Sequence, residues 1–66
     1  MQQGIVKWFD QKKGFGFINS LGDDFFIHIK DVVGRNGVEL REGDRVHFEP
    51  SSSSKGPVAK NLTLES

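Results

Sequence analysis

The sequence contains no cysteine, and its nine basic side chains are matched by nine acidic ones, so the formal net charge is zero. Without cysteine the chain has no disulfide and no thiolate metal site. Two histidines without cysteine are a poor basis for zinc, and we expect neither a metal nor a cofactor. No apolar run approaches a membrane span or a signal peptide. These absences favour a small cytoplasmic protein that forms a single domain over residues 1–66.

Helical periodicity is also missing, since no segment repeats apolar residues at helical spacing for three turns. Short β-prone segments alternate with turn residues and predict strands at 4–10, 15–20, 24–29, 44–50 and 58–64. Between them we expect a short helical turn at 30–33, a long loop at 34–43, a strand end at Pro50 and a flexible connection at Ser51–Ser54. Five short strands predict an all-β fold, a closed or nearly closed antiparallel barrel, because closure removes exposed sheet edges.

The second and third predicted strands carry most of the phenylalanines. Period-two alternation places Phe15 and Phe17 on one face and Ile18 on the other. In the third strand, Phe25 and Ile27 suit the same interior as Ile18. The other apolar side chains that we expect to compete for that interior are Ile5, Val6, Val32, Val46, Phe48 and Leu62. Four rings then remain together on the outer face: Phe15, Phe17, Phe26 and His28.

Lysines and one further ring surround this outer face. Lys7, Lys12 and Lys13 stand against a single acid, Asp10, within residues 1–20, and Trp8 lies among them. Rings that stack on bases and ammonium groups that meet phosphates are what an unpaired nucleic-acid strand requires. Gly14 and Gly16 mark a close approach by a ligand or by another backbone segment. Two alternatives are that the rings form the core, or that they form an oligomer or protein-binding interface.

Several single residues have two interpretations. Asp10 either accepts from a base edge or serves turn chemistry, and His28 is expected to stack on a base or hydrogen-bond to it. Phe9 is expected to be partly core, and His47 to face solvent. The arginines Arg35, Arg41 and Arg45 are expected to pair with local acids. No nucleophile–base–acid grouping and no Walker-type glycine loop occurs, so we expect neither an enzyme nor a helicase.

Several ordered motifs produce a resemblance to a known family. Lys13-Gly14-Phe15-Gly16-Phe17-Ile18 matches the start of the first ribonucleoprotein motif. The segments around it are Gly4-Ile5-Val6-Lys7-Trp8-Phe9, Asp24-Phe25-Phe26-Ile27-His28, Leu40-Arg41-Glu42-Gly43 and Lys55-Gly56-Pro57-Val58-Ala59-Lys60-Asn61. Together they make the chain resemble the small bacterial type of the cold-shock protein family along nearly its whole length.

The resemblance implies a five-stranded antiparallel Greek-key barrel of the oligonucleotide/oligosaccharide-binding type. It also implies a monomeric protein that binds single-stranded RNA and DNA, preferring pyrimidine-rich strands, with RNA-chaperone or antiterminator roles in the stress response. The implied binding residues are Lys7, Trp8, Lys13, Phe15, Phe17, Phe26 and His28, with Asp10 beside them.

The chain departs from the family pattern at three places. Ile29 and Gly37 stand where the family usually has aromatic residues, and Phe25 where a smaller β-branched residue is usual. Two stacking positions are therefore expected to be lost or weakened. The alternative function is a protein-interaction barrel that uses the aromatic face against a partner protein. Quenching of Trp8 fluorescence by an oligopyrimidine is expected only for a nucleic-acid binder.

Overall fold

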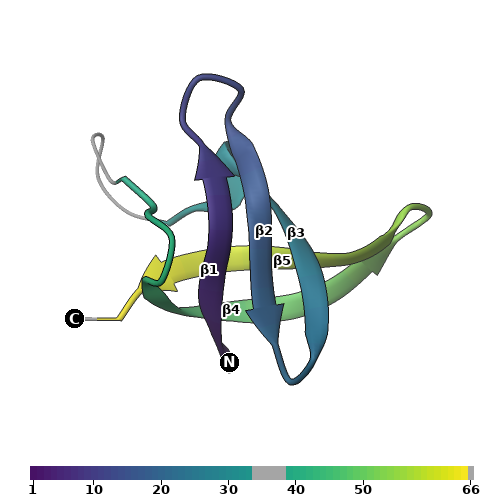
Figure 1. The fold of residues 1–66 in the computed structure, drawn as a ribbon. Helices are drawn as coiled ribbons and strands as arrows, with labels where there is room; N and C mark the ends of the chain where they lie inside the picture. The colour runs from purple at the N-terminus through teal and green to yellow at the C-terminus, as the bar shows by residue number, and fades with distance from the viewer. Residues whose placement is uncertain (34–38, 66) are drawn as a thin grey trace.

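The computed structural model describes residues 1–33 and 39–65, and these form five strands and one short 3₁₀ turn (Figure 1). The elements are β1 (Gln2–Asp10), β2 (Phe15–Ser20), β3 (Asp23–His28), η1 (Ile29–Asp31), β4 (Arg45–Ser53) and β5 (Gly56–Leu64). Each strand overlaps the segment that the sequence predicts, but β1 begins at Gln2 and β5 at Gly56, each two residues early, and β4 continues to Ser53 instead of ending at Pro50. β3 ends one residue early, at His28, and the helical turn begins at Ile29 rather than at Lys30.

The strands close into a barrel in the order β1-β2-β3-β5-β4. Every neighbouring pair is antiparallel except β3 and β5, which meet in parallel where Phe26 faces Val58. A ring with an odd number of strands cannot alternate direction all the way round, so one parallel seam is unavoidable. The predicted antiparallel barrel is confirmed, with this seam as its one parallel pairing among the described strands.

The barrel interior is a single apolar cluster, and Ile5 does not belong to it. The buried side chains are Val6, Ile18, Phe25, Ile27, Leu40, Val46, Phe48, Ala59 and Leu62, with Phe9 and Val32 packed against them. Ile5 was expected inside but is 49% exposed. Its neighbour Gly4 takes the inward position, where an added Cβ would lie 2.7 Å from the Ile18 side chain and 2.9 Å from Phe48. Because alternation is strict here, an inward Gly4 forces Ile5 outward.

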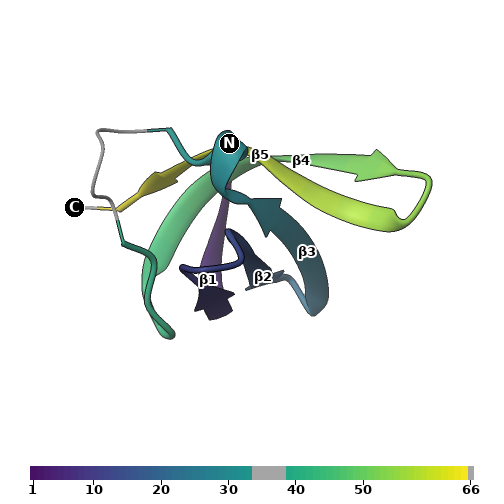
Figure 2. The ribbon, with the colours of Figure 1, turned by 90° about the horizontal axis from the view of Figure 1, so that it is seen from above.

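The second half of β4 corrects two sequence-based expectations. Pro50 does not end the strand, and Ser51–Ser53 are strand residues rather than a flexible connection. β4 pairs with β1 only up to Phe48, and beyond that point it pairs with β5 alone. A proline is tolerated on a strand with one open edge because no ladder hydrogen bond is required there. The β4–β5 hairpin therefore extends away from the barrel as a two-stranded ribbon (Figure 2).

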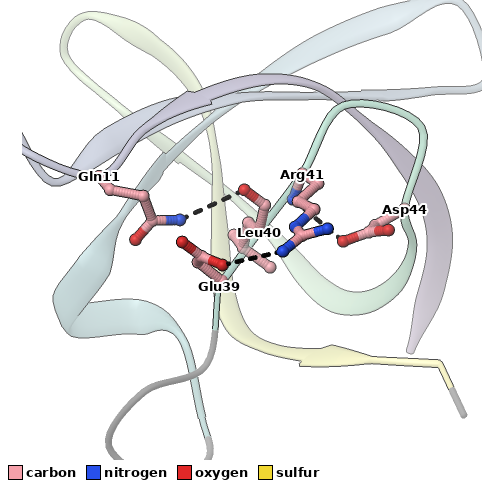
Figure 3. A network of polar contacts seen from close by, with 5 residues as sticks. All are labelled: Gln11, Glu39, Leu40, Arg41 and Asp44. Carbon is pink, nitrogen blue, oxygen red and sulfur yellow. Dashed lines mark hydrogen bonds and ion pairs between the residues drawn. The ribbon is translucent and has the colours of Figure 1, made fainter.

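The segment before β4 is hydrogen-bonded to the turn after β1. The side-chain amide of Gln11 donates to the carbonyl oxygen of Leu40 at 3.2 Å (Figure 3). Arg41 pairs with Glu39 at 3.3 Å, and its backbone N–H donates to Asp44 at 3.0 Å. The expected pairing of Arg41 with local acids is thus confirmed. Expectations for Arg35 and for the Asn36–Val38 segment, including Gly37, lie outside the described residues.

Within residues 1–33 and 39–65, no helix has the length and apolar character needed to cross a membrane. The same residues hold no group of three or more acidic, histidine or cysteine side chains placed to bind a metal ion.

Candidate nucleic-acid interface

The register of β1, β2 and β3 places aromatic side chains in two rows across the outer face of the barrel. Phe17 lies between Trp8 on β1 and Phe26 on β3, and Phe15 lies between Asp10 and His28. Phe15, Phe17, Phe26 and His28 are all partly exposed, whereas Ile18, Phe25 and Ile27 on the opposite face are buried. The predicted division of the two faces is confirmed, and the all-core alternative is wrong.

Four of these rings form one continuous surface, which we call the aromatic patch: Trp8, Phe15, Phe17 and Phe26. Trp8 lies edge-on to Phe15 with ring centroids 5.9 Å apart, and 5.6 Å from Phe17. Phe15 stacks on Phe26 at 5.8 Å, and Phe17 meets Phe26 edge-on at 5.7 Å. Such spacings are typical of favourable aromatic pairs, which hold the rings in place without a ligand. The patch is therefore a preformed apolar platform.

Trp8 reaches the patch because of an irregularity in β1. Strict alternation from Gly4 and Val6, which face the interior, would also turn Trp8 inward. The register shifts between Val6 and Trp8, so that Lys7 is an extra residue relative to β2. A bulge of this kind lets consecutive residues share one side of a sheet. Lys7 and Trp8 are consequently both exposed on the outer face. Period-two alternation along β1 does not predict this, because the bulge depends on pairing with β2.

The two glycines beside the patch, Gly14 and Gly16, are explained by the backbone conformation and packing of the protein itself. A Cβ on Gly16 would lie 2.7 Å from the Phe9 Cα and still closer to the Trp8 carbonyl oxygen, so β1 itself occupies that space. Gly14 has a positive φ of 76°, and its backbone closes the turn by donating to Asp10 and accepting from Ile29. Of the two interpretations offered for these glycines, close approach of another backbone segment is therefore the one that the structure supports.

Asp10 organises the turn at one end of the patch. Its Oδ1 accepts hydrogen bonds from the backbone N–H groups of Lys12 at 2.9 Å and Lys13 at 3.0 Å. An aspartate that bonds the backbone two and three residues ahead is a common turn-forming arrangement. Turn chemistry is thus the observed role of Asp10, and a base contact stays a prediction. The turn presents Lys12 and Lys13, both exposed, at this end.

His28 has one ring nitrogen engaged. Its Nδ1 accepts from the backbone N–H of Lys30 at 3.2 Å. In the neutral imidazole this assigns the proton to Nε2, which is then a donor. The other histidine, His47, is half-buried on β4 with its Nε2 3.6 Å from Glu65, so it has a partner rather than simply facing solvent.

Two lysines near the patch are paired with acids. The Lys7 ammonium lies 2.9 Å from Oδ2 of Asp24, and Asn19 donates to Oδ1 of the same carboxylate at 3.0 Å. The hydrogen bonds from Asn19 and then from Lys7 lower the pKa of Asp24 below its ordinary value of 3.8. Across the parallel seam, Lys60 lies 3.6 Å from Asp31. By contrast, no acid in the described part of the chain pairs with Lys12 or Lys13.

A cleft of about 650 Å³ continues from the patch toward the β4–β5 ribbon. Phe17 and Phe26 form one wall, and Pro57 and Val58 belong to the facing ribbon. The charged side chains that line it are Asp24, Asp31, Lys55 and Lys60. The cleft thus joins an apolar surface to a rim of mixed charge, a suitable place for a flat ring with polar edges.

Comparison with known proteins agrees with this geometry. A family model described as the 'Cold-shock' DNA-binding domain matches residues 2–65. Cold shock-like protein CspLB of Listeria monocytogenes is 45% identical over 64 residues, which cover 96% of this chain and 97% of that protein. Cold shock protein CspD of Bacillus subtilis is 46% identical over 63 residues, which cover 94% and 96%.

Among solved structures, Drosophila Unr CSD456 matches 98% of this chain with a TM-score of 0.78 and 21% sequence identity. This chain spans 26% of that one, and the likeness shows the fold alone. The family model and the two bacterial relatives show more than the fold, since they match nearly the whole chain. The chain therefore belongs to the cold-shock domain family, whose proteins bind nucleic acid and are not enzymes.

Proposed function

We propose that this protein binds single-stranded RNA and DNA by stacking successive bases on the aromatic patch. The observation that carries the proposal is the patch itself, four contiguous rings left partly exposed on the outer face of a closed barrel. Exposed rings stack on any unpaired base, whereas a duplex buries its base faces and gains nothing from them. The binding residues of the proposal are Lys7, Trp8, Asp10, Lys13, Phe15, Phe17, Phe26 and His28.

Stacking carries most of the affinity in this proposal. The formal net charge is zero, and Lys7 is already paired with Asp24. Among the described residues, Lys55 lines the cleft beside Phe17 and Phe26 without an ion pair, and Lys12 and Lys13 offer two further unpaired ammonium groups at the turn end of the patch. Phosphate contacts at this end position the strand, and the rings supply about 1–3 kcal/mol for each stacked base.

A preference for pyrimidine-rich strands is the finer part of the proposal. The resemblance to the cold-shock family supports it, and His28 is compatible with it, because a neutral imidazole whose Nδ1 accepts from Lys30 offers Nε2–H as a donor. The O2 carbonyl oxygen is an acceptor that cytosine, uracil and thymine share. A protein that holds such strands unpaired acts as an RNA chaperone or antiterminator without using ATP.

The test uses the single tryptophan as an internal reporter. Titration with oligothymidylate or oligouridylate is expected to quench Trp8 fluorescence, because Trp8 belongs to the patch and is 39% exposed. A duplex of equal length should leave the fluorescence unchanged, and an oligoadenylate should bind more weakly. Quenching by the duplex equal to that by the single strand would contradict the stacking mechanism.

Phe17→Ala and Leu21→Ala form a matched pair of variants for the same titration. Phe17 lies in the patch, whereas Leu21 is an apolar side chain that is 87% exposed at the turn between β2 and β3. Loss of affinity is expected only in Phe17→Ala. A fully folded wild type without affinity for any strand would favour the alternative function, a protein-interaction barrel.

A further inference from the structure

Lys7, one lysine of the proposed site, already forms an ion pair with an acid of the same protein. Lys7 stands on β1 and Asp24 on β3, so the lysine side chain spans the outer face of β2 to reach the acid at 2.9 Å. The register places Asp24 opposite Asn19, two residues along β2 from Phe17. The ion pair therefore lies at the border of the aromatic patch, at the opposite end of β2 from the turn that holds Lys13.

The carboxylate is held in place on both of its oxygens. Asn19 donates to Oδ1 at 3.0 Å, which leaves Oδ2 directed at the Lys7 ammonium. The lowered pKa of Asp24 agrees with this arrangement, because both hydrogen bonds favour the charged form. Lys7 and Asp24 remain 55% and 42% exposed in their side chains, so a ligand phosphate can reach the same ammonium.

We propose that Asp24 competes with nucleic-acid phosphates for Lys7 and so limits the affinity of this end of the patch. The inference rests on the proposed function. A phosphate that contacts Lys7 must displace a carboxylate that Asn19 has already oriented, whereas a phosphate at Lys12 or Lys13 displaces only solvent ions. The paired carboxylate acts as an internal counterion, and a strand that binds at Lys7 therefore gains less from the release of salt ions.

The competition makes the two ends of the patch unequal. The turn end carries two unpaired lysines, Lys12 and Lys13, and attracts phosphates. At the Asp24 end, the pairs Lys7–Asp24 and Lys60–Asp31 leave Lys55 as the one unpaired cation among the described residues that line the cleft, so stacking on Phe17 contributes more there. The bound strand is consequently anchored at the turn, and the Asp24 end can release it first. Asp24 is in this sense a positioning residue of the surface, acting through Lys7.

The experiment compares Asp24→Asn with Asp23→Asn. Both variants remove one negative charge at neighbouring positions, but Asp23 forms no ion pair with any residue that the structure describes. Asparagine at position 24 keeps an oxygen that can accept from Asn19, so the local geometry is preserved. Affinity for an oligothymidylate is measured at several salt concentrations by quenching of Trp8, and thermal unfolding of each variant is followed in parallel.

Asp24→Asn is expected to bind about two- to five-fold more tightly at low salt, the range that corresponds to loss of an exposed ion pair. The slope of log K against log salt should steepen by about 0.7, the contribution of one freed phosphate contact. Asp23→Asn should leave the slope unchanged. In addition, Lys7→Gln should change the slope little in the wild type but by about 0.7 in the Asp24→Asn background.

Three results would overturn the inference. Equal effects of Asp24→Asn and Asp23→Asn would show that only the overall charge matters. Weaker binding by a folded Asp24→Asn variant would show that Asp24 itself contacts the strand. Additive effects of Lys7→Gln and Asp24→Asn would show that the two residues are not coupled. Failure of the wild type to bind any strand is a separate outcome, and it would refute the proposed function.

Discussion

Phe25 and Phe26 are neighbours in β3, yet the barrel uses them in opposite ways. Phe25 points inward, is 8% exposed and packs on Phe48 with ring centroids 5.0 Å apart. Phe26 points outward and joins Phe15 and Phe17 in the aromatic patch. The two side chains have the same chemistry, so the difference between them comes from alternation alone. One face of the strand supplies stability, and the other supplies the surface that we propose for bases.

The largest effect is expected when the ring that faces the core, Phe25, is truncated. Phe25→Ala should cost about 3–5 kcal/mol of unfolding free energy, as for a large buried ring. A domain of this size usually has only about 3–5 kcal/mol in total, so most of this variant should be unfolded at 25 °C. Urea denaturation followed by circular dichroism measures the loss. A fully stable Phe25→Ala would show that the ring at position 25 contributes little to the core.

Phe26→Ala should give the opposite result, a loss of binding with little loss of stability. The same truncation on the outer face should weaken oligonucleotide binding by about 1–3 kcal/mol, and Phe15→Ala and Phe17→Ala should behave alike. Their unfolding free energies should fall far less than that of Phe25→Ala. Isothermal titration with an oligothymidylate, alongside urea denaturation, separates the two quantities. A patch variant that unfolds but keeps its affinity when folded would place that ring in the core.

Ile29→Phe extends the outer face by one ring. Ile29 follows β3 directly, is 44% exposed and has its Cγ2 near Gly14 at the patch end of the turn. A phenylalanine there should tighten binding by up to about 1 kcal/mol, by supplying a stacking surface. The same titration as for Phe26→Ala measures the gain. Unchanged affinity in a folded variant would mean that the bound strand does not extend past His28, where β3 ends.

Salt dependence separates stacking from charge on the outer face. With few unpaired lysines near the patch, the slope of log K against log salt should be shallow, roughly −1 to −3. Lys13→Gln should reduce its magnitude by about 0.7, whereas Arg41→Gln should not change it, because Arg41 is paired with Glu39 away from the patch. A wild-type slope steeper than about −5 would mean that phosphate contacts reach well beyond the patch.

The smallest effect concerns the titration of Asp24. Because its pKa is lowered by Asn19 and then by Lys7, any stability that these bonds provide is present above pH 3.8 and is lost as the pH falls through the lower, folded-state pKa. Lys7→Gln should raise the pKa of Asp24 partway toward 3.8, since Asn19 still donates. Carbon-detected NMR of the carboxyl group measures the midpoint. An unchanged midpoint would mean that Lys7 does not hold Asp24 in solution.

Local patterns in the sequence were enough to predict the strands and the two faces of β2 and β3. Turn residues mark the strand ends, and period-two alternation depends only on neighbouring residues. The same local reasoning failed in the ribbon, where Pro50 and the serines are weak strand formers. There, pairing with the antiparallel strand β5 stabilises the extended conformation in spite of the weak strand propensity. The residues of the ribbon do not by themselves indicate which strand they will pair with.

Residue order by itself determined an all-β barrel, an apolar interior built on Ile18 and Ile27, and an outward row of phenylalanines, because each depends on spacing along one strand. Two features depend on how distant segments pack: Trp8 joins that row, and Lys7 is paired with Asp24. The first depends on a bulge in the register between β1 and β2, and the second on a contact that spans three strands. Register and cross-strand contacts are set when distant segments pack together, so the spacing of residues along one strand carries no direct record of them.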